Sequence, residues 1–425
     1  MCSVTGAAKR LPVPLPDIKF SELYLKYLRG LVQSKAVLKQ NGYIVDQLSV
    51  KEIERKKRCY RCGQLFKKGK ISTQKESYDS TSKITLQQKM ADLHLQDNTI
   101  SSINQEKKSQ EAVNQSVKTK SEVEKKHETG EPVMRCRFHS GTLKRQQSHW
   151  NCCYQFRYSK GCQQAENHIC RNYKEGELEA YWKYYTTPKK YPGFMPRHAV
   201  ALDCEMGRNK YGETELIRLS AIDYFSSEVL IDSLVYPDAP MGDYNTRYSG
   251  VSFKQMEDAY RNRLCILGKD AAREALWKFV GPKTIVVGHS ANNDLSALRW
   301  IHELVIDTML IDYLEYVEEE KRAEINKKKA EAKTAEVILS NVEKTYDKSG
   351  DKSGNLVLDN TLREKKSQKS RGSGRFSLKI LTKERIGRSI QQGRSGHDSL
   401  EDATAARDLA HWNVIYKGKD DLILI

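Results

Sequence analysis

Two acidic side chains follow an apolar run near the middle of the 425-residue chain. Residues 199–202 are Ala-Val-Ala-Leu, and Asp203, Cys204 and Glu205 come next. Such a run predicts a buried strand, and alternate side chains of a strand point the same way, so Asp203 and Glu205 share a face. Neighbouring carboxylates repel each other and are costly to bury, which indicates a cation between them. A pair that merely faces solvent is the alternative.

A third acid lies after a later strand pattern. Residues 284–287 form an apolar run that ends at Gly288, and a polar turn and an amphipathic helix pattern follow. Asp294 falls in the first turn of this helix. An acid in that position also simply stabilises a helix N-terminus, which is the alternative interpretation.

A fourth acid and a histidine lie near the start of a final helix pattern. Ser399 and Asp402 resemble a capping box, which predicts that the helix begins near Ser399. Asp402 then lies on the inward face with Ala406 and Leu409, where a carboxylate needs a partner. His397 precedes the helix and can approach the same place from the loop, although a loop histidine is often a plain surface residue.

Taken in this order, the acids and the histidine resemble the DEDDh exonuclease superfamily. The neighbouring residues are similar to its RNA exonuclease branch. The motifs that carry this resemblance are Ala-Leu-Asp-Cys-Glu-Met-Gly at 201–207, Gly-His-Ser at 288–290, Val-Ile-Asp-Thr at 305–308, Ser-Leu-Lys at 377–379 with Ile-Gln at 390–391, and His-Asp-Ser-Leu-Glu-Asp-Ala at 397–403.

The resemblance implies a 3′→5′ exonuclease with a ribonuclease H-like α/β fold, in which helices flank a mixed β-sheet. It implies that two Mg²⁺ or Mn²⁺ ions are held by Asp203, Glu205, Asp294 and Asp402, and that His397 is the general base. Divalent ions of this type prefer oxygen ligands, and two of them about 4 Å apart activate water and stabilise the departing 3′ oxygen. A histidine base with an ordinary pKa of about 6.5 would make activity rise with pH through that region.

Residues beside the acids are expected to contact the terminal nucleotide. The resemblance implies this role for Cys204, Met206, Gly207 and His289. We expect Cys204 to be a small buried side chain rather than a nucleophile.

Cysteines and histidines cluster before this domain. The N-terminus lacks the pattern of a secretory signal peptide, so thiols are expected to bind metal before they form disulfides. The C-x2-C and C-x2-H spacings are typical of turns that wrap a tetrahedral Zn²⁺ ion. Eight ligands would fill two structural zinc sites: Cys59, Cys62, Cys136, His139, Cys152, Cys153, Cys162 and His168.

The cysteine region resembles a zinc module of the CHORD type. It is also similar to the region before the catalytic domain in fungal RNA exonuclease 3 proteins. Two alternatives stay open: Cys59 and Cys62 are free thiols and one zinc binds, or Cys170 competes as a ligand. Cys2 and Cys265 show no ligand spacing.

Composition shifts divide the chain into segments that position these groups. We expect an N-terminal helical region at 1–58, a zinc module at 59–170 with a disordered insertion at about 67–131, and a linker at 171–196. The exonuclease domain would span 197–418, with a charged insertion at about 315–375 that begins as an exposed helix. Each insertion is either a solvated segment without function or a basic arm that adds affinity for RNA.

The net charge of +17 favours a nucleic-acid partner, although plain solubility explains it too. No apolar run is long enough for a membrane span, so no membrane partner is expected. We predict an exoribonuclease that acts on RNA with a free 3′ end and matures small structured non-coding RNAs, with a protein partner possible through the zinc module. A DNA exonuclease and a non-catalytic zinc-dependent scaffold are the alternatives. The basic run at 55–58 suggests the nucleus as well as the cytoplasm.

Overall fold

The computed structural model describes residues 15–65, 134–143, 149–346, 374–393 and 396–417. They fall into two compact units, one formed by residues 1–65 and 169–425 and the other by residues 66–168. The insertion predicted at about 67–131 lies outside the described residues, as does the part of the charged insertion from 347 to 373. In the described part of the chain, no helix is both long enough and apolar enough to span a bilayer.

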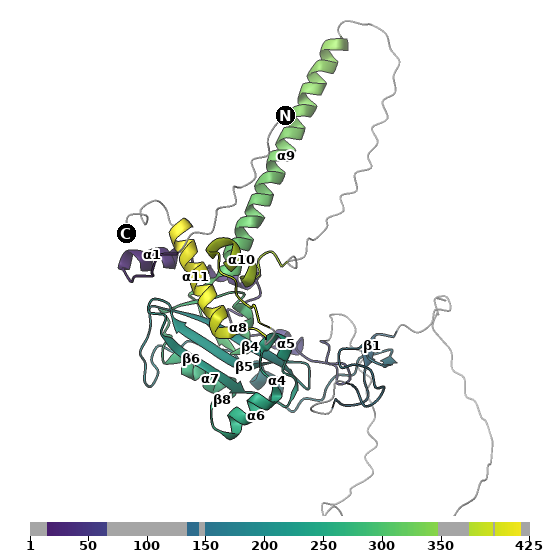
Figure 1. The fold of residues 1–425 in the computed structure, drawn as a ribbon. Coiled ribbons are helices and arrows are strands. Elements are labelled where there is room, and N and C mark those ends of the chain that lie inside the picture. The colour runs from purple at the N-terminus through teal and green to yellow at the C-terminus, as the bar shows by residue number, and fades with distance from the viewer. Residues whose placement is uncertain (1–14, 66–133, 144–148, 347–373, 394–395, 418–425) are drawn as a thin grey trace, which may run out of the picture. The chain divides into compact units, whose positions relative to one another are not determined.

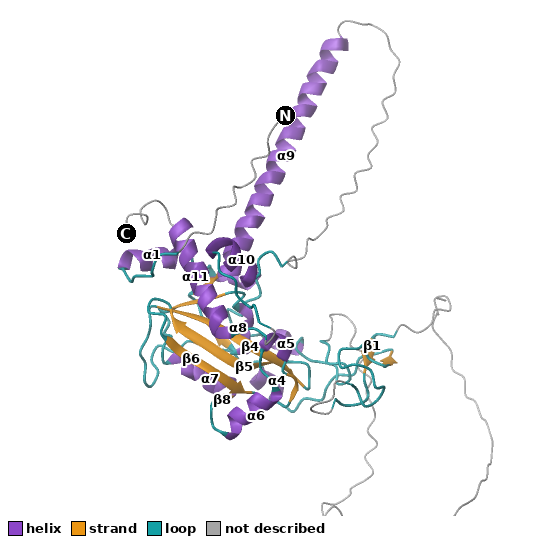
Figure 2. Ribbon diagram, in the orientation of Figure 1, coloured by secondary structure: helices purple, strands orange, loops and turns teal. Residues whose placement is uncertain are grey.

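The larger unit is an α/β fold (Figures 1 and 2). Its strands are β3 (Tyr185–Thr186), β4 (Ala199–Asn209), β5 (Thr214–Asp223), β6 (Val229–Tyr236), β7 (Met241–Asp243), β8 (Cys265–Leu267), β9 (Ile285–Gly288), β10 (Trp300–Ile301) and β11 (Val305–Asp307). Its helices are α1 (Glu22–Gly30), α2 (Lys35–Gln40), α3 (Val50–Glu54), α4 (Glu177–Tyr181), α5 (Thr246–Ser249), α6 (Phe253–Arg261), α7 (Gly268–Trp277), α8 (Asn292–Ala297), α9 (Thr308–Tyr346), α10 (Leu378–Ile386) and α11 (Ser399–Lys417).

A mixed seven-stranded sheet forms the centre of this unit. The order is β11-β9-β4-β5-β6-β8, and β7 pairs with the far end of β4. Strands β4, β5 and β6 are antiparallel, whereas β9 runs parallel to β4, β11 parallel to β9 and β8 parallel to β6. Helices flank this mixed sheet, so the predicted fold class is confirmed.

The two faces of β4 pack against different helices. Val200, Leu202 and Cys204 belong to the core cluster that also contains buried residues of α7 and α8. Ala199 and Ala201 belong to the cluster that contains buried residues of α1 and α11. Because side chains alternate along a strand, Asp203 and Glu205 lie on the face that α11 covers.

The N-terminal helical region is part of the larger unit, which corrects its assignment as a separate segment. In α1, Tyr24 and Leu28 pack in the cluster of β4 and α11, and the Tyr24 hydroxyl lies 2.7 Å from Nδ1 of His411. The backbone N–H of Gln33 donates to the carbonyl of Val305 at the outer edge of β11 (3.1 Å). These contacts extend the core by burying apolar surface that the sheet alone would expose.

The predicted linker at 171–196 is also packed on this unit. It forms α4 and β3, and β3 pairs with β10. Tyr184 is 1% exposed, and the Tyr181 hydroxyl donates to Oε1 of Glu215 (2.8 Å). Composition alone does not separate a polar connector from a segment that packs through a few aromatic side chains.

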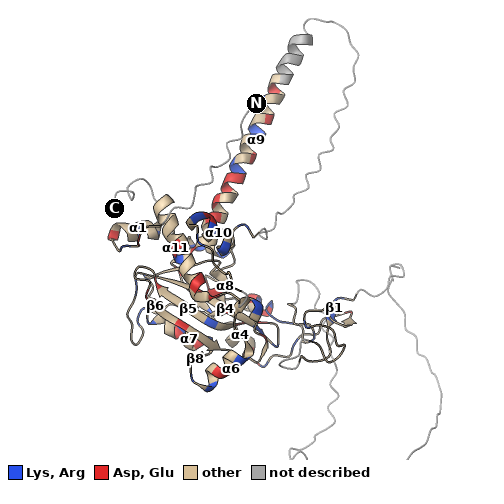
Figure 3. Cartoon of the chain, viewed as in Figure 1, with Lys and Arg blue, Asp and Glu red and all other residues tan. Residues whose placement is uncertain are grey.

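Helix α9 continues from β11 into the predicted charged insertion. The predicted pairs are present, with 3.8 Å between Glu318 and Arg322 and 2.9 Å between Glu324 and Lys328. Figure 3 shows acidic and basic residue positions interspersed along the coloured part of this helix. Exposed pairs of this type each stabilise a helix by about 0.3–0.5 kcal/mol.

The smaller unit has little regular structure among its described residues. β1 (Cys136–Phe138) and β2 (Gln163–Ala165) form an antiparallel pair in which Cys136 faces Ala165. The unit boundaries differ from the predicted module at 59–170, because Cys59 and Cys62 belong to the larger unit.

Candidate active site

Strand β4 supplies the first two acids. Asp203 pairs with Ser220 and Glu205 with Arg218 across the β4–β5 ladder, and the register shifts directly after Glu205. Glu205 is buried and Asp203 is half-buried. An irregularity of this type inside a strand re-aims the side chains next to it, as sites often require.

Asp294 is held in place by the backbone of β4. It lies in the first turn of α8 and is 2% exposed. The backbone N–H of Cys204 donates to Asp294 Oδ1 (3.0 Å). The predicted short strand, turn and helix are therefore present, and this hydrogen bond joins the third acid to the strand that carries the first two.

Asp402 lies on α11, which begins at Ser399 as predicted. The proposed capping box is wrong, because Asp398 is the residue that caps the helix by accepting from the N–H of Leu400 (3.1 Å). The Ser399 hydroxyl instead lies 2.7 Å from the hydroxyl of Ser220 on β5. This contact fixes the start of α11 over the sheet, beside the acids of β4.

Gln391 orients the carboxylate of Asp402. Its amide Nε2 donates to both carboxylate oxygens, at 3.1 and 2.9 Å, and its backbone has a positive φ of 55°. The sequence motif contained Gln391 but gave it no role.

His397 lies next to Asp402 and remains accessible. Its Nδ1 is 3.6 Å from Asp402 Oδ2, and its side chain is 42% exposed. Its backbone N–H donates to the carbonyl of Tyr248. Gly396 has φ +93°, and a Cβ there would lie 2.3 Å from the backbone nitrogen of Gly250. The close approach of two glycines therefore fixes where the histidine enters the site.

The pKa of each of the four carboxylates is raised, chiefly by burial. Burial, followed by the charges of the other three acids, holds the pKa of Asp203 well above its usual range. Burial, followed by the charge of Asp402, raises the pKa of Glu205 to about 8. Burial is also the main reason why the pKa of Asp294 rises to about 7 and that of Asp402 to about 6. The structure thus brings the four predicted acids from β4, α8 and α11 into one electrostatic cluster.

Arg218 is a neighbouring cation that the sequence did not indicate. Its charge lowers the pKa of both Asp203 and Glu205. Its guanidinium is already shared, however, with 2.9 Å to Asp232 and 3.0 Å to Asp398. Buried oxygen donors with so little compensating charge fit divalent cations such as Mg²⁺.

The remaining predicted substrate contacts lie beside these acids. Cys204 is buried, and burial raises the pKa of its thiol well above the usual value, as expected for a side chain that is not a nucleophile. Met206 is half-buried. A Cβ on Gly207 would lie 2.4 Å from Cε of Met241 and 2.8 Å from the carbonyl oxygen of Asp243, so β7 requires glycine there.

His289 has a structural role that the sequence did not reveal. Its Nδ1 lies 2.9 Å from the Thr308 hydroxyl and its Nε2 lies 3.0 Å from the carbonyl oxygen of Phe376. Both ring nitrogens are therefore engaged by the protein. Its predicted contact with a nucleotide stays a prediction and, in this arrangement, could involve only the ring face.

A four-residue cluster in the smaller unit matches half of the predicted zinc ligands. His139, Cys152, Cys153 and Cys162 place one ligand atom each within 4.8 Å of the others. The sulfurs of Cys152 and Cys162 are 3.6 Å apart, and His139 Nδ1 is 3.4 Å from the sulfur of Cys153. Ligands about 2.0–2.3 Å from a tetrahedral Zn²⁺ ion would stand about 3.3–3.8 Å apart, which agrees.

The surroundings of His139 also suit a metal ligand. Its Nε2 lies 3.2 Å from the carbonyl oxygen of Ser159, and the ring stacks on Trp150 with centroids 4.3 Å apart. A ligating histidine generally donates its second ring N–H to such an acceptor, which fixes the ring orientation.

The other four predicted zinc ligands divide between the units. Cys59 and Cys62 lie close together in the larger unit, where the N–H of Gly63 donates to the carbonyl of Cys59 and forms the turn expected for C-x2-C. Cys136 and His168 lie close together in the smaller unit. The thiol of Cys170 donates to the carbonyl of Arg171. A second zinc site built from the two pairs stays a prediction.

Comparison with known proteins gives several relatives by sequence. The chain is 32% identical over 184 residues to RNA exonuclease 3 of Candida albicans, which covers 43% of each chain. It is 35% identical over 182 residues to the RNA exonuclease 1 homolog of Homo sapiens, covering 41% of this chain and 14% of that one. RNA exonuclease 3 of Emericella nidulans is 27% identical over 296 residues, covering 64% and 37%. The match thus spans less than half the length of each of these relatives.

Other comparisons add little. No family model matches the sequence. Among solved structures, the Pan2 catalytic unit of Neurospora crassa is 18% identical with a TM-score of 0.33, covering 56% of this chain and 30% of that one. The sequence relatives, found independently of the acidic geometry, confirm that this chain resembles the RNA exonuclease branch of the DEDDh superfamily.

Proposed function

We propose that the protein is a 3′→5′ exoribonuclease that removes nucleotides from RNA 3′ ends. The observation that carries this proposal is the coupled cluster of Asp203, Glu205, Asp294 and Asp402, with His397 beside it. The four acids would hold two Mg²⁺ or Mn²⁺ ions. When bound, these ions would activate water and stabilise the charge that develops on the departing 3′ oxygen.

The side chains around the cluster have distinct roles in this proposal. His397 would accept the proton of the attacking water on Nε2, since its Nδ1 faces Asp402. Gln391 would keep the Asp402 carboxylate from rotating, because it donates to both oxygens. Burial of the cluster would strengthen each charge interaction in the reaction, since little water screens it.

RNA is the proposed substrate because the sequence relatives are named RNA exonucleases. The acidic site itself does not distinguish RNA from DNA, since that choice depends on contacts to the 2′ hydroxyl. By the same resemblance we propose precursors of small structured non-coding RNAs, of the small nuclear and RNase MRP RNA type, as the molecules trimmed.

The cysteine and histidine clusters are proposed as two structural Zn²⁺ sites that bind RNA or a protein partner. Residence in the nucleus and the cytoplasm is likewise a proposal. The basic run at 55–58 supports it only in part, because Lys56 lies 4.5 Å from the Trp182 ring and Arg58 donates to the carbonyl of Gly63. Two of the four cations are therefore engaged within the protein.

Degradation of a 5′-labelled single-stranded RNA in Mg²⁺ tests the proposal. Wild type would be compared with Asp203→Ala and with a DNA of matched sequence. We expect a one-nucleotide ladder on RNA that the variant abolishes and that is weaker on DNA. A stronger ladder on DNA would favour a DNA exonuclease, and no ladder from folded, zinc-loaded protein would favour a non-catalytic scaffold.

A further inference from the structure

A group of exposed aromatic rings lies in the smaller unit. Phe156 is 50% exposed and Tyr158 is 66% exposed, and their ring centroids are 5.5 Å apart. The ring of His149, which is also exposed, lies 5.9 Å from that of Phe156. A single exposed ring is common on protein surfaces, but rings in contact form a continuous patch, which indicates an interaction site. We call His149, Phe156 and Tyr158 the aromatic platform.

Hydrogen bonds hold the backbone that presents the platform. The indole N–H of Trp150 donates to the carbonyl of Arg157 (3.1 Å), and the N–H of Ser159 donates to the carbonyl of Phe156 (2.8 Å). Both ends of this turn reach His139 of the cysteine cluster, which stacks on Trp150 and lies 3.2 Å from the carbonyl oxygen of Ser159. A partner therefore meets rings whose backbone is already ordered, which lowers the entropic cost of binding.

The charge of the smaller unit favours an anionic partner. Its described residues (134–143 and 149–168) contain one acidic side chain, Glu166, and four basic ones, Arg135, Arg137, Arg157 and Lys160. The Arg157 guanidinium lies 5.5 Å from the centroid of the Tyr158 ring. Exposed rings interleaved with cations fit a strand in which bases alternate with phosphates, because the rings stack on bases and the cations attract the backbone.

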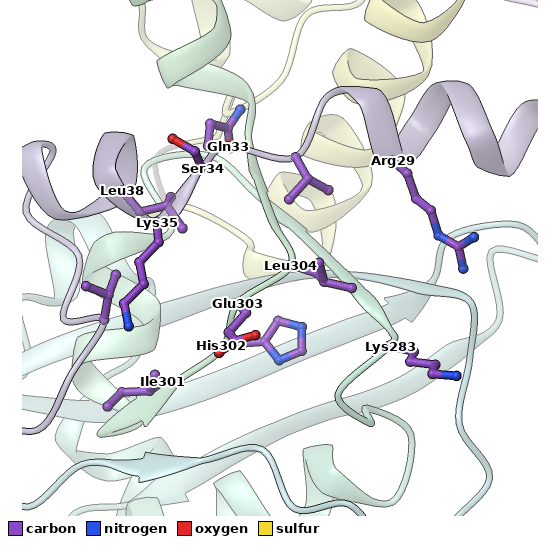
Figure 4. A pocket seen from close by; sticks show the side chains of 12 residues that line it. Arg29, Gln33, Ser34, Lys35, Leu38, Lys283, Ile301, His302, Glu303 and Leu304 are labelled. Carbon is purple, nitrogen blue, oxygen red and sulfur yellow. The ribbon is translucent and has the colours of Figure 1, made fainter.

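A cavity of about 790 Å³ in the larger unit offers no comparable surface (Figure 4). Arg29 and Lys283 line it, but the only aromatic ring among its lining residues is that of His302, which is 4% exposed. The nitrogens of this ring lie 2.7 Å from the Thr187 hydroxyl and 2.7 Å from the carbonyl oxygen of Thr284. The cavity therefore lacks an exposed ring on which a base could stack.

We propose that the aromatic platform binds single-stranded RNA, with bases stacked on Phe156 and Tyr158 and with Arg157 and Lys160 at the phosphates. Every base has a π-face, so this binding should tolerate many sequences. The choice of RNA over DNA rests on the proposed function, whereas stacking itself follows from the rings and charges of the smaller unit. The excess of cations over carboxylates favours a nucleic acid over a protein as the partner of this unit.

Hydrogen exchange of the full-length Asp203→Ala protein, with and without oligouridylate, tests the proposal together with Kd from fluorescence anisotropy. The Asp203→Ala background keeps the RNA intact during the measurement. Phe156→Ala with Tyr158→Ala removes two rings, whereas the exchanged pair Phe156→Tyr with Tyr158→Phe keeps both. Tyr260→Ala is the matched control, because this tyrosine is 46% exposed and lies on α6 of the larger unit.

We expect oligouridylate to slow the exchange of amides within 154–160. The two-alanine variant should bind at least about tenfold more weakly, since each lost stack removes much of the affinity for one base. The exchanged pair and Tyr260→Ala should bind like their Asp203→Ala parent. An abasic oligomer of the same length should give little protection at 154–160, because it has phosphates but no bases.

Three results would overturn the proposal: no protection at 154–160, an unchanged Kd in the two-alanine variant, or equal protection by the abasic oligomer. If amides at 136–139 exchange faster in the two-alanine variant without RNA, its fold is disturbed, and Tyr158→Ala alone takes its place with the same expectation. The ladder assay on wild type is scored separately. Absence of a ladder would contradict the exoribonuclease proposal and leave the result at 154–160 as it stands.

Discussion

Asp203 and Glu205 lie on the face of β4 that α11 covers, so the charge of Asp402 on that helix raises the pKa of both where little water screens it. A cluster of like charges opposes folding unless a cation enters it. The free energy of unfolding should therefore depend on the charge state of these carboxylates and on a bound cation, and it can be measured without any substrate.

The first prediction concerns stability and pH. The pKa is raised to about 8 for Glu205, about 7 for Asp294 and about 6 for Asp402, above the ordinary values of about 4. A group whose folded pKa is raised favours folding below its ordinary pKa and loses that contribution as pH rises through the raised value. The metal-free protein should therefore lose stability between about pH 4 and pH 8, and Mg²⁺ should raise Tm more at pH 8 than at pH 5.

Differential scanning calorimetry with and without added Mg²⁺ measures this effect, and Glu205→Gln is the control. The variant should melt higher than wild type without Mg²⁺ at pH 8 and gain less from the ion. An equal gain at both pH values would show that Mg²⁺ does not bind these carboxylates.

The second prediction concerns the position of the histidine. His397→Ala should lower kcat by roughly 10²–10⁴-fold, the usual contribution of a general base. Gly396→Ala should lower kcat by roughly 10²-fold with His397 still present, because a Cβ there collides with Gly250 and displaces the base. Single-turnover RNA cleavage measures both. A Gly396→Ala enzyme with wild-type kcat would show that this backbone contact does not position the base.

Some of these residues could be predicted from sequence and others could not. The alternation of a strand placed Asp203 and Glu205 on one face, and the turn after Gly288 placed Asp294 in a first helical turn. Arg218 could not be predicted, because its position depends on the register of β4 against β5. The capping role of Asp398 was missed because Ser399 hydrogen-bonds to β5 instead, a contact between residues far apart in sequence.

At the scale of elements, α1 and α11 cover the β4 face that carries the acids. The third prediction tests whether α1 stabilises that domain. Leu28 is fully buried in the shared cluster, whereas Leu23, five residues earlier on the same helix, is 38% exposed. Leu28→Ala should lower the free energy of unfolding by about 2–5 kcal/mol, and Leu23→Ala by less than about 1 kcal/mol.

Urea unfolding followed by circular dichroism measures the difference. Similar, small losses for the two variants would mean that α1 is not part of the cooperative core. Leu23 is exposed and Leu28 is buried because the orientation of α1 is set by its packing on α11 and β4.

The observed element boundaries differ most from the predicted ones in segments whose secondary structure depends on contacts with residues far away in the sequence. The linker at 171–196 contains α4 and β3 because Tyr184 is buried and β3 pairs with β10. The exposed part of helix α9 could be predicted from the sequence, because the ion pairs that stabilise it join residues four positions apart on the same helix.

At the scale of the whole molecule, the chain combines an α/β unit with a cysteine-rich unit. The fourth prediction is that the purified protein holds two Zn²⁺ ions. Cys152→Ser should remove one, because Cys152 belongs to the cluster with His139, whereas Cys265→Ser should remove none. Atomic emission spectrometry gives the count. One ion in wild type would mean that Cys59, Cys62, Cys136 and His168 do not form a second site.

The central claim is that Asp402 acts in the reaction and is not merely a buried acid of α11. Asp408 is the matched control: it lies on the same helix, is similarly buried, and pairs with Arg388 (2.6 Å) and Arg407 (2.8 Å). The most direct measurement is the single-turnover rate on 5′-labelled RNA for Asp402→Asn and Asp408→Asn at a temperature where both are folded. We predict a loss of more than about 100-fold for Asp402→Asn, since residues that only support metal ligands already contribute roughly 10–100-fold, and a rate near wild type for Asp408→Asn. Equal rates for the two variants would contradict the account.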